Sequence, residues 1–229
     1  MENSVTLDYA GTVKVMQGDL PQLYEHQVDA MANLNQIDQK SQFNSLLVLP
    51  TGGGKTLTAT YWLLKNAVDK KKKVLWIAHR HLLLEQAADT FKRIACTSLL
   101  IHRTSFNYRI VSGKHDRPIH INDKDDVLIV SKDSIIRNLD LLNKWLKDEE
   151  EIYIVIDEAH HVTAKSYRRI LDYIRKNSND VKLLGLTATP FRTADDEEGL
   201  LAKIFTDDIV YKIDLKDLIK KGILSRPEF

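Results

Sequence analysis

The sequence contains little cysteine and almost no net charge. Its 229 residues include a single cysteine, Cys96, and the 33 lysines and arginines exceed the 32 aspartates and glutamates by one. A lone cysteine excludes an intramolecular disulfide, which fits a reducing compartment, and Cys96 is expected to be a small core residue. Balanced charge creates no global basic field, so any contact with nucleic acid must come from local groups.

Long apolar runs are also absent. No stretch approaches the roughly 18 apolar residues of a membrane-spanning helix, and residues 1–4 are polar, unlike the start of a secretory signal. We therefore expect a cytoplasmic protein with no membrane partner. With 43% hydrophobic and 28% charged residues, the chain is long enough for one large α/β domain.

The most informative stretch is a glycine loop between an apolar run at 46–49, typical of a buried strand, and a helix-like run at 57–68. Strand, glycines, Lys-Thr and helix in this order predict a phosphate-binding loop. Glycines let successive N–H groups point at one anion, and the helix start adds the positive end of its dipole. The predicted ligand is ATP with Mg²⁺, held by Thr51, Gly52, Gly53, Gly54, Lys55 and Thr56.

Two residues of this loop have distinct predicted roles. Lys55 can reach the β- and γ-phosphates, and the Thr56 hydroxyl can ligate Mg²⁺. The common pattern has another glycine where this chain has Leu49. The alternative interpretation is a glycine turn with a surface lysine, which the strand and helix on either side of the loop disfavour.

Short apolar runs and helix-like runs then alternate along the chain. This alternation predicts an α/β fold with a mostly parallel sheet and helices on both faces, whose ligands bind at the carboxyl ends of the strands. An edge strand is predicted at 12–16. Further strands are expected at 74–78, 127–130, 152–156 and 183–186, and helices at 20–34, 82–94, 132–146 and 164–176.

The section between the second and third buried strands is polar. Its basic part, 102–117, places Phe106 and Tyr108 among positive charges. Such a pattern is compatible with a nucleic-acid-facing insertion. A solvated hairpin is the favoured alternative, because several aspartates follow closely.

An acidic pair, Asp157 and Glu158, follows the strand predicted at 152–156. Carboxylates at the end of a buried strand are costly unless a cation or hydrogen bonds meet them. Asp157 would hold Mg²⁺ through water, and Glu158 would orient and deprotonate the water that attacks the γ-phosphate. The predicted catalytic set is therefore these two acids and Lys55. The alternative is an acidic turn that caps the next helix.

The next predicted strand ends in Thr187 and Thr189, whose hydroxyls can hydrogen-bond the acidic motif. The segments 50–56 (Pro-Thr-Gly-Gly-Gly-Lys-Thr), 157–160 (Asp-Glu-Ala-His) and 187–192 (Thr-Ala-Thr-Pro-Phe-Arg) resemble motifs I, II and III of superfamily-two helicases. They are most similar to the branch of restriction-enzyme motor subunits and related DEAD/DEAH-box helicases.

This resemblance covers about residues 20–225 and implies a RecA-like P-loop NTPase fold. It implies one domain over 1–225, in which 1–45 is an extension that carries a glutamine motif. Residues 226–229 would begin a linker to a second RecA-like domain of a longer chain. The family's glutamine motif resembles residues 23–27, so Gln27 would read the adenine edge and Tyr24 could stack on the base. A helix-surface Gln27 is the alternative.

The resemblance also implies contacts with nucleic acid. Residues 78–83 resemble motif Ia, in which Arg80 would grip a phosphate and His79 would position the backbone. Residues 130–134 resemble motif Ib, in which Ser131 would hold another phosphate. The alternative for His79 and Arg80 is that both are solvated residues at a helix start. The alternative for Ser131 is that it is a plain N-cap.

The last residue with an implied role in coupling is His160, which would link the ATP state to the nucleic-acid side through Thr187 and Thr189; a structural histidine is the alternative. Arg192 could face nucleic acid or a partner domain.

Together these features predict the first motor domain of an ATP-dependent helicase or translocase, with DNA favoured over RNA as its partner. A second RecA-like domain would complete the ATPase, and this chain alone would be nearly inactive. The alternatives are a P-loop ATPase of another kind and a non-catalytic, nucleotide-gated nucleic-acid-binding module.

Overall fold

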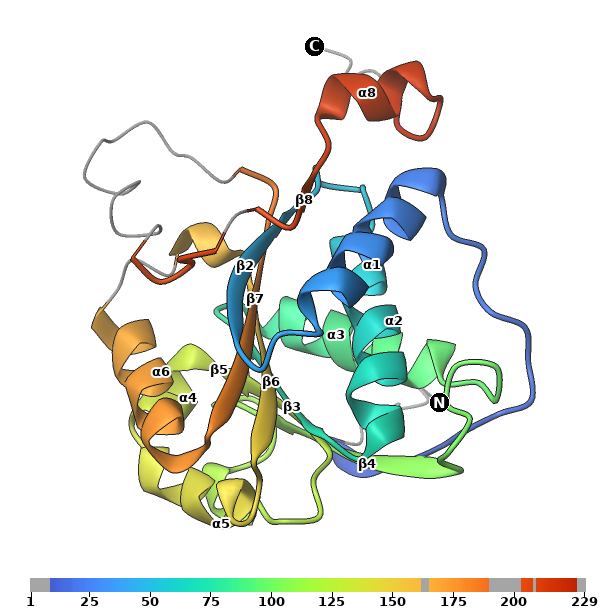
Figure 1. Ribbon diagram of the computed structural model, residues 1–229. Coiled ribbons are helices and arrows are strands. Elements are labelled where there is room, and N and C mark those ends of the chain that lie inside the picture. The colour runs from blue at the N-terminus through green and yellow to red at the C-terminus, as the bar shows by residue number, and fades with distance from the viewer. Residues whose placement is uncertain (1–8, 162–164, 190–202, 208, 226–229) are drawn as a thin grey trace, which may run out of the picture.

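The computed structural model describes residues 9–161, 165–189, 203–207 and 209–225, and within these ranges the chain forms one eight-stranded sheet covered by helices (Figure 1). The strands are β1 (Ala10–Lys14), β2 (Phe43–Val48), β3 (Lys73–Ala78), β4 (Ser105–Val111), β5 (Val127–Ser131), β6 (Glu151–Asp157), β7 (Asp180–Thr187) and β8 (Tyr211–Lys212). The helices are α1 (Glu25–Ile37), α2 (Lys55–Asn66), α3 (His81–Ile94), α4 (Lys132–Ile136), α5 (Leu142–Leu146), α6 (Lys165–Asn177) and α8 (Leu215–Lys220).

The strands lie in the order β1-β4-β5-β3-β6-β7-β2-β8. β1 pairs antiparallel with β4, whereas the remaining pairings are parallel. A parallel sheet buries both faces, so its central strands are apolar throughout. This arrangement confirms the predicted α/β fold, including the edge strand near the N-terminus.

Helices α1, α2 and α3 cover one face of the sheet, and α4, α5 and α6 cover the other (Figure 1). Side chains alternate between the two faces along each strand. On β3, Trp76 therefore packs in the cluster beneath α2 and α3, whereas Ile77 packs in the cluster beneath α4 and α6. Cys96 is buried in the first cluster, as predicted.

Two predicted helices have different limits in the structure. The helix predicted at 20–34 begins only at Glu25 and continues to Ile37. The helix predicted at 132–146 is wrong, because the chain breaks into α4, a short 3₁₀ turn (Leu139–Leu141) and α5. The break occurs at Asn138, whose backbone is not helical and whose side chain donates to the Ser134 carbonyl.

The basic section 102–117 is not a solvated hairpin, because residues Ser105–Val111 form β4, an internal strand between β1 and β5. Phe106 and Tyr108 are buried in the core rather than presented to nucleic acid. Both arginines at 103 and 109 are paired within the domain: Arg109 with Asp116 and Asp125, and Arg103 with Asp126 through both of its terminal nitrogens at 2.7 and 3.0 Å.

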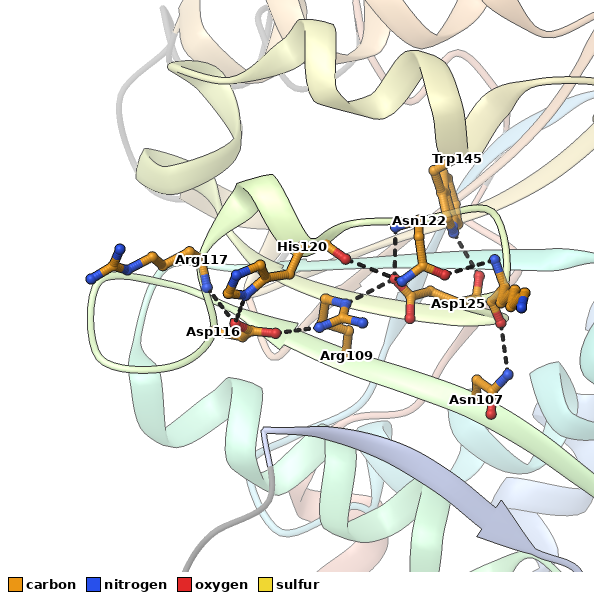
Figure 2. A network of polar contacts seen from close by, with 9 residues as sticks. Asn107, Arg109, Asp116, Arg117, His120, Asn122, Asp125 and Trp145 are labelled. Carbon is orange, nitrogen blue, oxygen red and sulfur yellow. Dashed lines mark hydrogen bonds and ion pairs between the residues drawn. The ribbon is translucent and has the colours of Figure 1, made fainter.

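A polar network fastens the segment after β4 to the sheet (Figure 2). Arg109 donates to Asp125 at 2.9 Å and also contacts Asp116. Asp125 in turn accepts the Asn122 amide at 3.0 Å on its carboxylate and the Trp145 indole N–H at 2.7 Å on its carbonyl. The Arg109 side chain is only 14% exposed, so water competes little for these bonds, and they hold the segment between β4 and β5 in a fixed position.

Within the ranges described above, no helix combines the length and apolarity needed to cross a bilayer.

Candidate functional site

The glycine loop connects the end of β2 to the start of α2. Gly52 and Gly54 adopt φ values of 81° and 84°, which side-chain-bearing residues rarely adopt. The Gly53 amide donates to the Pro50 carbonyl at 2.9 Å, and the first helical bond runs from Thr58 to Gly54. The loop therefore curls tightly before the N-terminus of α2, where free N–H groups and the helix dipole favour an anion.

Lys55 lies at the first position of α2. Its ammonium donates to the Leu49 carbonyl at 3.3 Å. Burial lowers its pKa, and the nearby charges of Glu158 and Asp157 partly oppose that effect. Leu49 is fully buried, so the position at which the common pattern has glycine here supplies an apolar anchor and a carbonyl acceptor.

The acidic pair stands at the carboxyl end of β6. Asp157 is 3% exposed and accepts the Glu158 amide at 2.9 Å. Burial, followed by the charge of Glu158, raises the pKa of Asp157 to about 6. Glu158 has a φ of 51°, a strained conformation for a residue other than glycine that often marks functional sites.

The glycine loop and the acidic pair line one cavity of about 360 Å³, as their predicted shared role requires. From these motifs the lining includes Thr51, Gly52, Gly54, Lys55, Thr56, Asp157 and Glu158. Helix α3 closes the opposite wall with Leu83, Gln86, Thr90 and Arg93. Sequence reasoning missed this wall, although the spacing of three, four and three residues places these side chains on one helical face.

The donors in this cavity fit a nucleoside triphosphate and Mg²⁺. Glycine N–H groups, the start of α2 and Lys55 suit the phosphates. The described residues contain no group of three or more His, Cys, Asp or Glu that could hold a metal. Mg²⁺ commonly binds one or two protein oxygens plus phosphate oxygens and water, which Thr56 and the costly buried Asp157 would supply.

The predicted glutamine motif packs against the glycine loop. Gln27 is 3% exposed, so the alternative of a helix-surface residue is wrong. Its carbonyl accepts the Tyr24 amide at 2.9 Å. The neighbouring His26, which sequence reasoning did not single out, is fully buried and its Nε2 lies 2.9 Å from the Gly53 carbonyl oxygen. The motif therefore braces the loop from outside the cavity lining.

Tyr24 remains accessible for the predicted stacking on a base. It is 55% exposed and its ring stacks on that of His26, with 5.9 Å between ring centroids and an interplanar angle of 14°.

The predicted coupling residues are in contact. His160 Nδ1 lies 3.2 Å from the Thr187 hydroxyl oxygen and 3.3 Å from a carboxylate oxygen of Glu158. The Thr187 hydroxyl also accepts the Thr189 amide at 3.2 Å. A continuous set of polar contacts therefore joins the acidic motif to the end of β7. Arg192 lies outside the residues that the structure describes.

A second cavity, of about 650 Å³, opens at the carboxyl ends of β3 and β5. Both His79 and Ser131 line it, together with the cations Lys114, Arg117 and Arg137. Arg80 is exposed at the start of α3 but does not belong to this lining.

Ser131 also acts as the predicted N-cap. Its hydroxyl accepts the Ser134 amide at 3.3 Å at the start of α4.

One wall of the second cavity is held by a chain of hydrogen bonds that sequence reasoning missed. Ser112 Oγ lies 2.9 Å from His81 Nδ1 and 2.5 Å from His115 Nδ1. His115 continues the chain to Glu85 at 2.9 Å. These contacts tie the turn after β4 to the first turns of α3, so two separate segments form one rigid wall.

Comparisons with known proteins agree with this geometry. The chain is 32% identical over 218 residues to "Putative ATP-dependent helicase IRC3" of Saccharomyces cerevisiae, covering 91% of this chain and 29% of that protein. It is 28% identical to the type I restriction enzyme EcoAI endonuclease subunit of Escherichia coli, covering 91% and 24% of the two chains. It thus spans less than a third of the length of these relatives.

The fold resembles that of the Pyrococcus furiosus Hef helicase domain, with a TM-score of 0.59, 24% identity and coverage of 78% of this chain and 36% of that one. This likeness confirms the RecA-like fold. The family described as "Type III restriction enzyme, res subunit" matches residues 20–192. Since that match covers most of the sequence, the chain belongs to the ResIII family of superfamily-two helicases.

Proposed function

We propose that this chain is the first motor domain of an ATP-dependent DNA helicase or translocase. The observation that carries the proposal is the single cavity lined by both the glycine loop and the acidic pair. A phosphate cradle facing two carboxylates suits the binding of ATP with Mg²⁺ and in-line attack by water.

Each residue of the cavity would have a distinct role in ATP binding or hydrolysis. Lys55 and the loop amides hold the phosphates, while Thr56 and Asp157 hold the metal, which neutralises charge on the phosphates when bound. Glu158 accepts a proton from the attacking water. His160, in contact with both Glu158 and Thr187, transmits the state of the site along the end of β7.

Nucleic acid would bind at the second cavity. The ring of His79, the hydroxyl of Ser131 and the positive end of the α3 dipole suit backbone phosphates, and Arg80 adds an exposed charge at the start of that helix. DNA is favoured over RNA because relatives include a DNA repair factor helicase/translocase subunit, 25% identical, and an ATP-dependent DNA helicase, 30% identical.

A second RecA-like domain of the same full-length protein would complete the ATPase. The domain proposed here extends over residues 1–225, and residues 226–229 would begin the linker. A second domain would supply arginine to the transition state, a contribution of about 10³–10⁵ in rate where such a residue is added in trans. Hydrolysis by the proposed motor would therefore depend on that second domain.

The test is ATP hydrolysis by the full-length protein with single- and double-stranded DNA and RNA as activators. DNA should stimulate turnover more than RNA. Glu158→Gln should lower turnover by about 10²–10⁴ because the general base is lost. Glu150→Gln makes the same chemical change at an exposed position before β6, at the end of the strand away from Glu158, and should leave turnover unchanged.

Other outcomes would favour the alternatives. ATP hydrolysis that neither DNA nor RNA stimulates would indicate a P-loop ATPase of another kind. Turnover that is absent in the wild type, with nucleotide-dependent binding of nucleic acid retained, would indicate a non-catalytic binding module.

A further inference from the structure

Residues of α4, of the turn that follows it and of α6 line a groove of about 760 Å³. Both helices lie on the face of the sheet opposite α1, which carries the glutamine motif (Figure 1). Ile136, Leu139 and Tyr173 form its apolar base. Its remaining lining is charged and consists of Arg137, Asp140, Lys165, Arg168, Arg169, Asp172 and Lys176. The groove therefore combines a non-polar base with five cations and two carboxylates.

The cations of α6 lie along one side of that helix. Lys165, Arg168, Arg169 and Lys176 recur at intervals of three, one and seven residues, which places them on one helical face. The opposite side of α6 is buried in the core through Tyr167, Ile170, Leu171 and Ile174. From the first to the last cation the helix rises about 16 Å, at about 1.5 Å per residue.

Among the residues that the structure describes, no ion pair involves Arg137, Lys165, Arg168, Arg169 or Lys176, and all five are exposed. Elsewhere in the domain partly buried cations are neutralised, as Arg103 is by Asp126. A row of exposed and unpaired cations on both walls of a groove favours a polyanionic ligand.

The groove and the second cavity share one lining residue. Arg137 lines both, and α4, which forms one wall of the groove, begins directly after Ser131. A strand held at His79 and Ser131 would therefore leave the second cavity beside Arg137 and meet the row of cations on α6.

We propose that the α4–α6 groove binds the phosphodiester backbone of a duplex that continues beyond the strand held at His79 and Ser131. This inference rests on the proposed nucleic-acid role of the second cavity. A strand of B-form DNA rises 3.4 Å per nucleotide, so the row of cations matches about five nucleotides. The apolar base supports the aliphatic stems of the arginines and lysines, whose charged ends face solvent.

The test uses the full-length protein, a fluorescent 20-nucleotide single-stranded DNA and the same strand paired over half its length. Binding to each is measured by anisotropy over a series of salt concentrations. Arg168→Glu/Arg169→Glu should weaken binding to the partly paired DNA at least tenfold and reduce its salt slope by about 2, since each lost phosphate contact removes about 0.9. Single-strand binding and hydrolysis without DNA should stay unchanged.

Lys216→Glu/Lys220→Glu provides the matched control, because it makes the same change in net charge at exposed positions of α8. It should not alter the preference for paired DNA. Arg168→Gln/Arg169→Gln should show a smaller loss in the same direction, which guards against an effect of charge reversal on folding.

The outcomes separate this inference from the proposed function. If the wild type binds neither DNA, both fail together. If the wild type binds both DNAs and Arg168→Glu/Arg169→Glu binds the paired form unchanged, the inference fails while the proposed function stands. In that case an acidic protein surface becomes the better candidate for the groove.

Discussion

The side chain of Gln27 occupies the space beside Gly54 that any larger residue would need. A Cβ atom at position 54 would stand 2.1 Å from the Gln27 amide nitrogen, well inside van der Waals contact. The φ of 84° at Gly54 adds a second obstacle to a side chain. The glutamine motif and the last glycine of the loop therefore fit each other closely, and His26 supports the preceding residue, Gly53.

We expect Gly54→Ala to weaken ATP binding and to destabilise the domain by about 1–3 kcal/mol, because alanine would be strained at this φ and would displace Gln27. Urea unfolding measures the stability change, and binding of a fluorescent ATP analogue measures the effect on the site. Gly113→Ala is the control, since a Cβ there would have nothing within 4 Å. Equal behaviour of the two variants would contradict the fit described here.

The buried carboxyl of Asp157 predicts a specific pH dependence of stability. Its pKa is about 6 in the folded protein against an ordinary value of 3.8, so the folded state holds its proton more tightly than the unfolded state. Stability therefore falls as pH rises from about 3.8, where the unfolded state ionises, to about 6, and the loss reaches about 3 kcal/mol once both states are ionised. Asp157→Asn should stabilise the protein at pH 8, without metal or nucleotide, by an amount of that order.

The gain from Asp157→Asn should shrink as pH falls from 8 to 5, because the wild-type carboxyl then becomes neutral in the folded state. Thermal unfolding in the presence of a chelator at several pH values tests this. Asp123→Asn, at an exposed position, should change the midpoint little at any pH. A gain from Asp157→Asn that is the same at both pH values would rule out burial as the source.

The central strands and the loop could be predicted from sequence because their signals are local. An apolar run such as 127–130 predicts a buried strand, and glycines followed by Lys55 predict a phosphate-binding loop, whichever other elements of a parallel α/β fold lie beside them. The strand β4 could not be recognised, because Arg109 within it and the charged residues around it suggest exposure when the aspartates that neutralise Arg109 are unknown. Arg109, for example, meets both Asp116 and Asp125 only after the chain folds back.

Functional residues whose importance depends on contacts made only in the folded chain were likewise hard to predict. Sequence predicted which motifs would meet at the strand ends, because parallel strands bring their carboxyl ends to one edge. It missed His26 and the α3 wall with Gln86 and Arg93, since their importance depends on which helix packs beside the loop. The implied roles of Arg80 and Tyr24 stay predictions, because neither belongs to the lining of the two cavities at the strand ends.

Arg109 is expected to be the most sensitive residue of the network in Figure 2. Arg109→Met would leave Asp116 and Asp125 without their shared cation in a site of low exposure, which should cost about 3 kcal/mol. Lys220→Met removes a lysine that is 78% exposed from its pair with Asp217 and should cost less than about 1 kcal/mol. Urea unfolding of the two variants should therefore separate them clearly, and similar losses would refute the structural role assigned to Arg109.

The contact between His160 and Thr187 predicts a variant that separates hydrolysis from its stimulation by DNA. Thr187→Val removes the hydroxyl that meets His160 and the Thr189 amide, while leaving Lys55 and the acidic pair in place. In the full-length protein, basal hydrolysis should persist, whereas the stimulation by DNA should fall at least about fivefold, within the usual range of coupling between sites.

Thr60→Val is a closely matched control for Thr187→Val. Both threonines are fully buried, but the Thr60 hydroxyl has no hydrogen-bond partner among the residues that the structure describes. Replacing it should preserve stimulation and leave stability unchanged or slightly raised, because no bond is lost. If Thr60→Val reduced stimulation as much as Thr187→Val, the effect would come from packing of buried threonines, and the polar contact at His160 would carry no signal.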